Sequence, residues 1–126
     1  MVAFNFKPEF VDLIKSGIKT QTIREKARCK IGDNLQLYTG MRTKACKKII
    51  DAVCTSITPI YIDSGSEIVK LGSHRLNAAQ LEELAIKDGF NNDDNFLLFF
   101  NDNYGEFFNG YLITWSLEPQ NASPER

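Results

Sequence analysis

The stretch "CKKIIDAVCTSITPIYI", residues 46–62, is long and rich in β-branched residues. Its charged side chains stand only at its beginning and at Asp51, so most of it suits a half-buried sheet. Pro59 lacks the amide hydrogen that a central strand donates. The stretch therefore predicts one or two strands, with a break near Pro59.

Three further stretches have the two-residue period of strands. In "KIGDNLQLYTG", residues 30–40, a Gly-Asp turn precedes apolar residues that alternate with polar ones. "SEIVKLG", residues 66–72, predicts a shorter strand that ends at a glycine turn. "GYLITWSL", residues 110–117, predicts a last strand whose one face carries Tyr111, Ile113, Trp115 and Leu117.

Capping residues and apolar spacing indicate two helices at defined positions. The first has Pro8 among its early residues and ends before Gly17. The second has clearer boundaries, because Asn77 and Gln80 form the pattern of a capping box and Gly89 follows the last turn.

A third helix is predicted from Asn91 or Asn92 to Gly105, with an apolar stripe of phenylalanines at positions 96, 99 and 100. The resulting order is helix, several strands, two helices and a strand, without parallel βαβ alternation. This order favours an α+β domain built on an antiparallel or mixed sheet or a small barrel, with about three flanking helices. We expect one domain over residues 1–117 and a disordered polar tail over residues 118–126.

Composition narrows the class of protein. A chain of 126 residues that is 43% hydrophobic suits one globular domain. No apolar run is long enough for a membrane helix, and the N-terminus lacks the pattern of a signal peptide. The three cysteines form no C-x-x-C pair, which favours reduced thiols. We therefore expect a cytoplasmic protein without membrane partner, metal site or cofactor.

The charged residues are unevenly distributed along the chain. Ten basic residues stand against two acids between Lys15 and Lys48, whereas seven acids stand against one lysine between Glu82 and Glu106. A basic face that attracts phosphates is one interpretation. The alternative is that folding mixes the two sets of charges on the surface.

The segment "SGIKTQTIRE", residues 16–25, is a candidate for chemistry. A partly desolvated lysine has a lowered pKa and acts as a base, and a neighbouring threonine hydroxyl acts as a nucleophile, which fits Lys19 and Thr22. In an extended strand Thr22 and Arg24 share one face and Lys19 takes the other. Lys19 and Thr22 therefore meet only where the chain turns. The alternative is an ordinary strand with solvated cations.

Asp88 occupies an unusual place for a carboxylate. It continues the apolar stripe of the second helix at its C-terminus, where the helix dipole disfavours negative charge. It therefore requires a cationic partner, for which Lys19 and Arg24 are candidates, unless the last turn frays and Asp88 reaches water. Aromatic residues that could stack on an exposed base include Tyr38 and Phe90.

Four segments together resemble the ASCH domain family: "IKSGIKTQTIRE", "IGDNLQLYTGMRT", "AIKDGF" and "NGYLITW". The resemblance runs from about Phe4 to Trp115. It implies a small β-barrel similar to the PUA RNA-binding domain, with helices around it and a cleft at the K-T-x-T-I-R segment, residues 19–24.

The resemblance also implies site residues. Some bacterial members of the family hydrolyse the acetyl amide of acetylcytidine with a lysine and a threonine of this segment and a glutamate from a later helix. By motif these fall on Lys19, Thr22 and Asp88, and the arginine falls on Arg24. Asp88 is one methylene shorter than the family's glutamate. Other members resemble RNA-binding modules or ribonucleases.

Three functions stay open at this point. The first is binding of RNA or a modified nucleoside in a cleft around residues 19–24. The second is hydrolysis, as an acetylcytidine amidohydrolase or ribonuclease, with Lys19, Thr22 and Asp88 as catalytic residues. The third is a protein-interaction module. For the first, the expected binding residues are Arg24, Lys26, Arg28, Tyr38, Arg42, Lys44 and Phe90.

Overall fold

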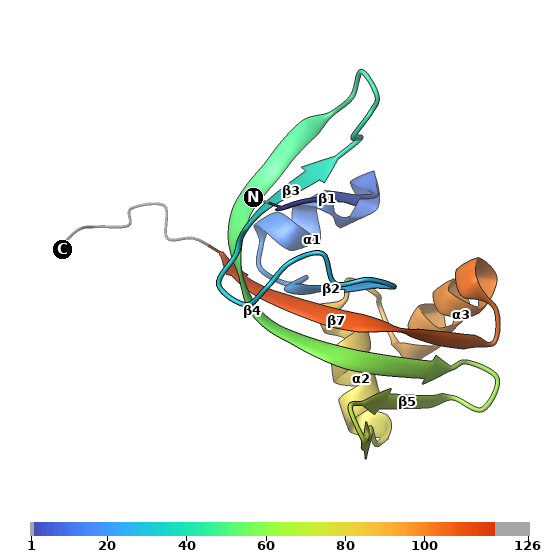
Figure 1. Ribbon diagram of the computed structural model, residues 1–126. Helices are drawn as coiled ribbons and strands as arrows, with labels where there is room; N and C mark the ends of the chain where they lie inside the picture. Colours follow the sequence, from blue (N-terminus) through green and yellow to red (C-terminus); the bar gives the residue numbers. More distant parts are fainter. Residues whose placement is uncertain (1, 118–126) are drawn as a thin grey trace.

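The computed structural model describes residues 2–117, whose strands form one seven-stranded mixed sheet with three α-helices (Figure 1). The predicted tail at 118–126 lies outside these residues. In chain order the elements are β1 (Val2–Phe6), the 3-10 helix η1 (Pro8–Phe10), α1 (Val11–Lys15), β2 (Gln21–Arg24), β3 (Asn34–Thr39), β4 (Lys47–Asp63), β5 (Ile68–Leu71), β6 (His74–Arg75), α2 (Ala78–Lys87), α3 (Asp93–Tyr104) and β7 (Phe107–Leu117).

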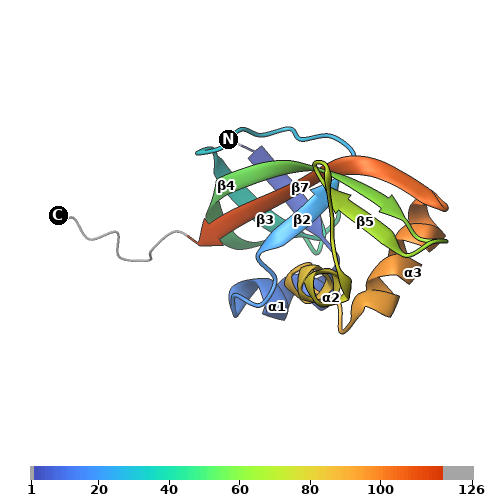
Figure 2. The same cartoon turned by 90° about the horizontal axis from the view of Figure 1, so that it is seen from below.

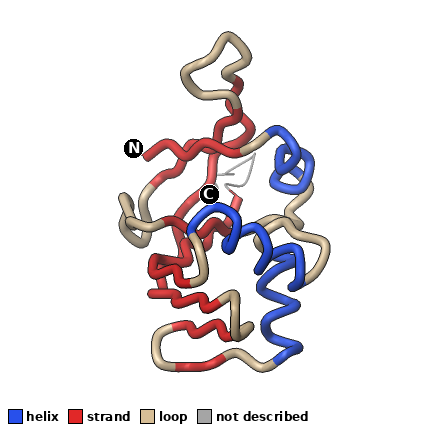
Figure 3. Tube along the Cα trace, turned by 90° about the vertical axis from the view of Figure 1, so that its right-hand side faces the viewer, coloured by secondary structure: helices blue, strands red, loops and turns tan. Residues whose placement is uncertain are grey.

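The long strand β4 organises the sheet. β3 pairs with its first part, β5 with its last part, and β7 with most of its length. β1 then adds to β3 in parallel, and β2 adds to β7 in antiparallel orientation. Figures 2 and 3 show the helices gathered along one side of this curved sheet. The α+β class is confirmed.

The expected barrel closure is wrong. Within residues 2–117 no ladder joins β1 to β2, so the sheet is not closed into a barrel. The physical reason is that a side chain of β2 occupies the seam between β1 and β2. The Asn5 carbonyl of β1 accepts a hydrogen bond of 2.9 Å from Arg24 Nη2, a side chain of β2, instead of one from a neighbouring backbone.

The stretch 46–62 forms one strand without a break at Pro59. This residue pairs with Tyr111 on one side, and on the other side the ladder with β5 begins only at Ile60. The missing amide hydrogen of Pro59 therefore costs no hydrogen bond in the ladder between β4 and β5. The irregularities in β4 are instead two register shifts, one against β7 between Cys54 and Ser56 and one against β3 between Lys48 and Ile50. Two further strands, β1 and the two-residue β6, were not predicted from the sequence.

The predicted helices are confirmed at their ends. Asn77 and Gln80 make both hydrogen bonds of the capping box of α2, and the Asn92 side chain caps α3. Gly17 and Gly89 have φ values of 82° and 101°, which glycine adopts readily. The expected first helix is shorter than its pattern, because its beginning is the 3-10 helix η1.

Two apolar clusters form the core. One lies between α2, α3 and the sheet and includes Phe96 and Phe100, and the other lies around β1, β3 and α1 and includes Leu35 and Trp115. All three cysteines are free, although Cys29 Sγ and Cys54 Sγ lie 4.0 Å apart. None of the described helices is long and apolar enough to cross a membrane.

Candidate functional site

A pocket of about 180 Å³ opens at the seam between β1 and β2. Its walls come from β1, the η1–α1 region, β2, the end of α2 and α3. Because β2 pairs only with β7, its other edge is free, and side chains from both of its faces reach the pocket. Five of the predicted residues line it, and they come from two segments that are distant in sequence: Lys19, Thr22 and Arg24 from one, and Asp88 and Phe90 from the other.

Lys19 lies just before β2 and is 3% exposed. Its Nζ donates a hydrogen bond of 2.5 Å to the backbone oxygen of Asp88 and lies 3.6 Å from Asp88 Oδ1. The same Nζ lies over the rings of Phe10 and Phe6, 4.9 and 5.5 Å from their centroids. The lysine therefore caps the C-terminus of α2 and also faces an aromatic surface.

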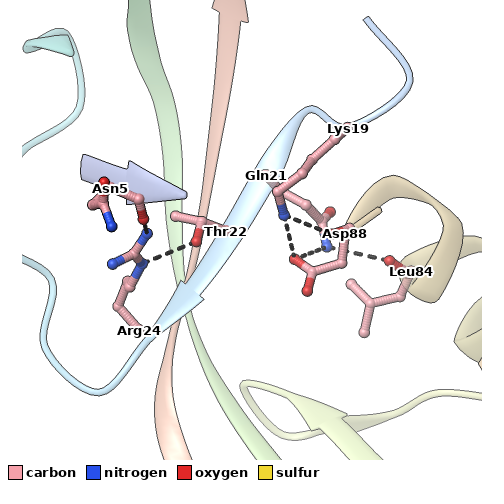
Figure 4. Close-up of polar contacts among 7 residues, drawn as sticks. All are labelled: Asn5, Lys19, Gln21, Thr22, Arg24, Leu84 and Asp88. Carbon is pink, nitrogen blue, oxygen red and sulfur yellow. Dashed lines mark hydrogen bonds and ion pairs between the residues drawn. The ribbon is translucent and has the colours of Figure 1, made fainter. Parts of the chain in front are cut away.

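Asp88, the C-cap residue of α2, is buried as its position in the helix predicted. Besides the lysine it has one more polar partner, because Gln21 Nε2 lies 3.3 Å from its Oδ1 and also 3.3 Å from the carbonyl of Leu84. Figure 4 shows Lys19 and Gln21 directed together towards Asp88. The fraying alternative for the last turn is therefore wrong.

Burial shifts both groups of this pair towards their neutral forms. It lowers the pKa of Lys19 below its ordinary value, against the opposite effect of Asp88. It raises the pKa of the Asp88 carboxyl, against the opposite effects of Lys19 and Gln21. Such a pair lining a pocket is suited to proton transfer or to hydrogen bonding with a polar ligand.

Thr22 and Arg24 lie on the other side of β2 (Figure 4). Arg24 Nε donates a hydrogen bond of 3.0 Å to Thr22 Oγ1, and the guanidinium carbon lies 5.0 and 5.2 Å from the ring centroids of Phe4 and Phe6. Burial lowers the pKa of Arg24, which nevertheless stays charged near neutral pH. Its second terminal nitrogen, Nη1, has no hydrogen-bond partner among the described residues.

The two faces of β2 thus separate the proposed catalytic residues. Thr22 Oγ1 accepts its hydrogen bond from Arg24, and no hydrogen bond between Thr22 and Lys19 occurs among the described residues. The turn that would bring these two side chains together is absent, although both line the pocket. Phe6 instead connects the two cations, because Lys19 and Arg24 lie over the same ring.

A cationic groove continues from the pocket. It is a hollow of about 740 Å³ that shares Asn5, Arg24 and Tyr104 with the pocket. Its charged lining residues are four cations and one acid: Arg24, Lys26, Arg28, Arg42 and Glu25. The predicted phosphate contacts Lys26, Arg28 and Arg42 thus lie together, and the acids of residues 82–106 do not enter the groove.

Two predicted binding residues lie elsewhere. Tyr38 and Lys44 line neither the pocket nor the groove, and Lys44 belongs to the β3–β4 connection, which projects beyond the rest of the molecule (Figure 3). Sequence reasoning missed Asn5, Phe6 and Phe10. The alternation of Phe4 and Phe6 around Asn5 is the signal of a strand that would have pointed to Asn5 and Phe6.

Among the described residues no three His, Cys, Asp or Glu side chains are grouped as metal ligands. Comparison of the chain with protein-family models, with curated proteins and with solved structures finds no match. The resemblance to the ASCH family therefore stays a prediction from the motifs. By its fold and its site, the chain is classed as an α+β protein with a pocket lined by aromatic residues and cations.

Proposed function

We propose that this protein binds RNA or a modified nucleoside, with one base in the pocket and phosphates along the cationic groove. The observation that carries the proposal is the continuity of the two hollows through Asn5, Arg24 and Tyr104. Aromatic walls suit a base, and clustered cations suit phosphates. The resemblance of residues 14–25 and 85–90 to motifs of the ASCH family supports the same ligand class.

The pocket supplies both the surfaces and the polar groups that a base requires. The rings of Phe6, Phe10 and Phe90 line it, and its volume of about 180 Å³ suits one planar group rather than an extended ligand. Arg24 Nη1 and Lys19 Nζ offer donors to base oxygens, and Asp88 offers an acceptor to an exocyclic amine. These are the partners that hydrogen-bonding edges of bases use.

Binding measurements test this proposal. Cytidine monophosphate, acetylcytidine and a short single-stranded RNA are titrated into the protein and into Arg24→Met, which loses the guanidinium. We expect at least a tenfold loss of affinity in the variant, about 1.4 kcal/mol, because one desolvated cation serves both hollows. Lys70→Ala is the matched control, because this exposed cation of β5 lines neither hollow.

The dependence of RNA affinity on salt concentration is a second test in the same titrations. The RNA affinity is expected to fall steeply from about 50 mM to about 200 mM salt, and Lys26→Ala is expected to reduce the slope by about one. Absence of binding by all three probes, or affinity for RNA that is independent of salt, would contradict the proposal.

The buried Lys19–Asp88 pair favours hydrolysis as a second candidate function. In this hypothesis Thr22 or a water attacks the acetyl carbonyl of acetylcytidine, and Lys19 or Asp88 passes the proton of the attacking oxygen to the exocyclic amine of cytidine as the C–N bond breaks. Where Thr22 attacks, a water then hydrolyses the acetyl ester on Thr22 and releases acetate. Incubation with acetylcytidine beside Lys19→Ala decides it. Release of cytidine and acetate by the unchanged protein alone supports an enzyme, and equal release by the variant rejects it. The protein-interaction module predicts instead that Lys19→Ala and Arg24→Ala leave the function intact.

A further inference from the structure

A third hollow extends the path of the pocket and groove. It has a volume of about 380 Å³ and shares Glu25 and Asn109 with the cationic groove. Pro59, Tyr61 and Tyr111 also line it. The three hollows therefore form one continuous path, which runs from the aromatic pocket through the cationic groove to a hollow on β4 and β7.

Tyr111 gives this last hollow an aromatic surface. It is 38% exposed, and it takes part in none of the close aromatic pairs found within residues 2–117. By contrast Tyr104, at the end of α3, packs on Phe100 and Phe108. The ring of Tyr111 is therefore available to a planar ligand.

The strand register places Tyr111 beside the groove. Arg24 of β2 pairs with Tyr111 of β7, and Tyr111 pairs with Pro59 of β4 on its other side. Paired residues of antiparallel strands share one face of the sheet, with their Cβ atoms about 5 Å apart. Arg24, which lines both the pocket and the groove, is thus the direct cross-strand neighbour of the exposed Tyr111.

The charges along the path alternate with the aromatic surfaces. The cations are concentrated in the groove, whereas the acid Glu25 stands at its junction with the third hollow. A phosphate is favoured beside the cations and disfavoured beside Glu25, whose carboxylate suits an amino or hydroxyl group. The sequence of aromatic, cationic and aromatic surfaces matches base, phosphate and base in a nucleic-acid strand.

We propose that the ligand is a single-stranded nucleic acid of at least two nucleotides, whose second base stacks on Tyr111. This inference rests on the proposed function, because it takes the first base to occupy the pocket. It adds a second base subsite and requires a polymer rather than a free nucleoside. RNA and DNA share this chemistry, and the probes distinguish them.

The experiment compares a mononucleotide with a ribodinucleotide and a deoxyribodinucleotide. The probes are titrated into the unchanged chain and into Tyr111→Ala, Tyr111→Phe and Phe107→Ala. Phe107 is the matched control, because it is an exposed aromatic residue of the same strand, 56% exposed, and lines none of the three hollows. Thermal unfolding of each variant verifies that the exposed substitutions leave the fold intact.

We expect the dinucleotides to bind about tenfold more tightly than the mononucleotide, as one stacked base contributes. Tyr111→Ala is expected to remove this gain and to leave mononucleotide binding unchanged, whereas Tyr111→Phe and Phe107→Ala retain it. Mononucleotide binding without a gain for either dinucleotide, or a gain that survives Tyr111→Ala, overturns this inference alone. Absence of binding by every probe overturns the proposed function as well.

Discussion

At the scale of single residues, the Lys19–Asp88 pair presents the clearest energetic conflict. Both side chains are almost fully buried, with 4% and 7% of their side-chain surface exposed. Taking two charges out of water costs more than their attraction commonly returns, whereas removing one partner leaves the other unpaired. The pair is therefore a poor source of stability and a good candidate for function.

A double-mutant cycle tests this interpretation. We expect Lys19→Met and Asp88→Asn each to lower the free energy of unfolding by about 3–5 kcal/mol, because one buried polar group loses its partner. The double variant is expected to be at least as stable as the unchanged protein. Urea unfolding near neutral pH measures all four proteins. A double variant that stays clearly less stable than the unchanged protein would contradict this interpretation, and losses that simply add would show that the two side chains are not coupled.

The pH dependence of stability has a defined sign. Because burial raises the pKa of folded Asp88 above 3.8, its stabilising contribution is present below pH 3.8 and is lost as the pH rises through the raised value. The lowered pKa of Lys19 gives a contribution that is present above 10.5 and is lost as the pH falls through the lowered value. The double variant should gain stability relative to the unchanged protein between these limits.

At the scale of elements, the end of α2 decides where the pocket forms. Gly89 follows this helix with a φ of 101°, and a Cβ there would lie 2.8 Å from the Phe10 ring and 3.1 Å from Lys19 Cδ. A glycine is therefore required for two reasons, namely its backbone conformation and the close approach of two pocket side chains. The helix end, Phe10 and Lys19 form one packed unit.

Gly89→Ala tests this packing against Gly17→Ala. Gly17 also has a positive φ, 82°, but a Cβ there meets nothing within 4 Å. We expect Gly17→Ala to cost about 1–2 kcal/mol of backbone strain, and Gly89→Ala to cost more because Phe10 and Lys19 must also move. Urea unfolding measures both. Equal losses would show that Gly89 is needed only for its backbone conformation.

At the scale of the whole molecule, two apolar clusters share one sheet. Trp115, the only tryptophan, lies in the cluster around β1, β3 and α1, whereas α2 and α3 pack on the other cluster. β4 and β7 pass through both, because their ladder extends from Ala52–Leu117 to Asp63–Phe107. Neither cluster has a sheet of its own, so we expect them to unfold together.

This expectation is checked by two probes of urea unfolding. Trp115 fluorescence reports the first cluster, and far-ultraviolet circular dichroism reports mainly the helices of the second. The two curves are expected to coincide, and Leu35→Ala and Phe96→Ala are expected to shift both by about 2–5 kcal/mol, because each residue is fully buried. Separate midpoints for the two probes would contradict a single domain.

The elements that could be predicted from the sequence are those whose ends depend on residues close together in the chain. The capping box at Asn77 and Gln80, the end of α2 at Gly89 and the alternation in β3 could be predicted, because capping and periodicity involve residues close in sequence. The burial of Asp88 was predictable for the same reason, since its place on the helix stripe is a local property. The unbroken β4 was not, because Pro59 is tolerated only through the position of β5.

Tertiary structure alone decided how the site is assembled. The pairing of the strands determines where the seam between β1 and β2 lies. It also places Tyr111 beside Arg24, although these two residues lie far apart in sequence. The sequence by itself determined which side chains could bind a base and phosphates, because that is a property of their chemistry. Only the packing of distant segments decided that Lys19 contacts Asp88 rather than Thr22, because such contacts depend on the relative positions of whole elements.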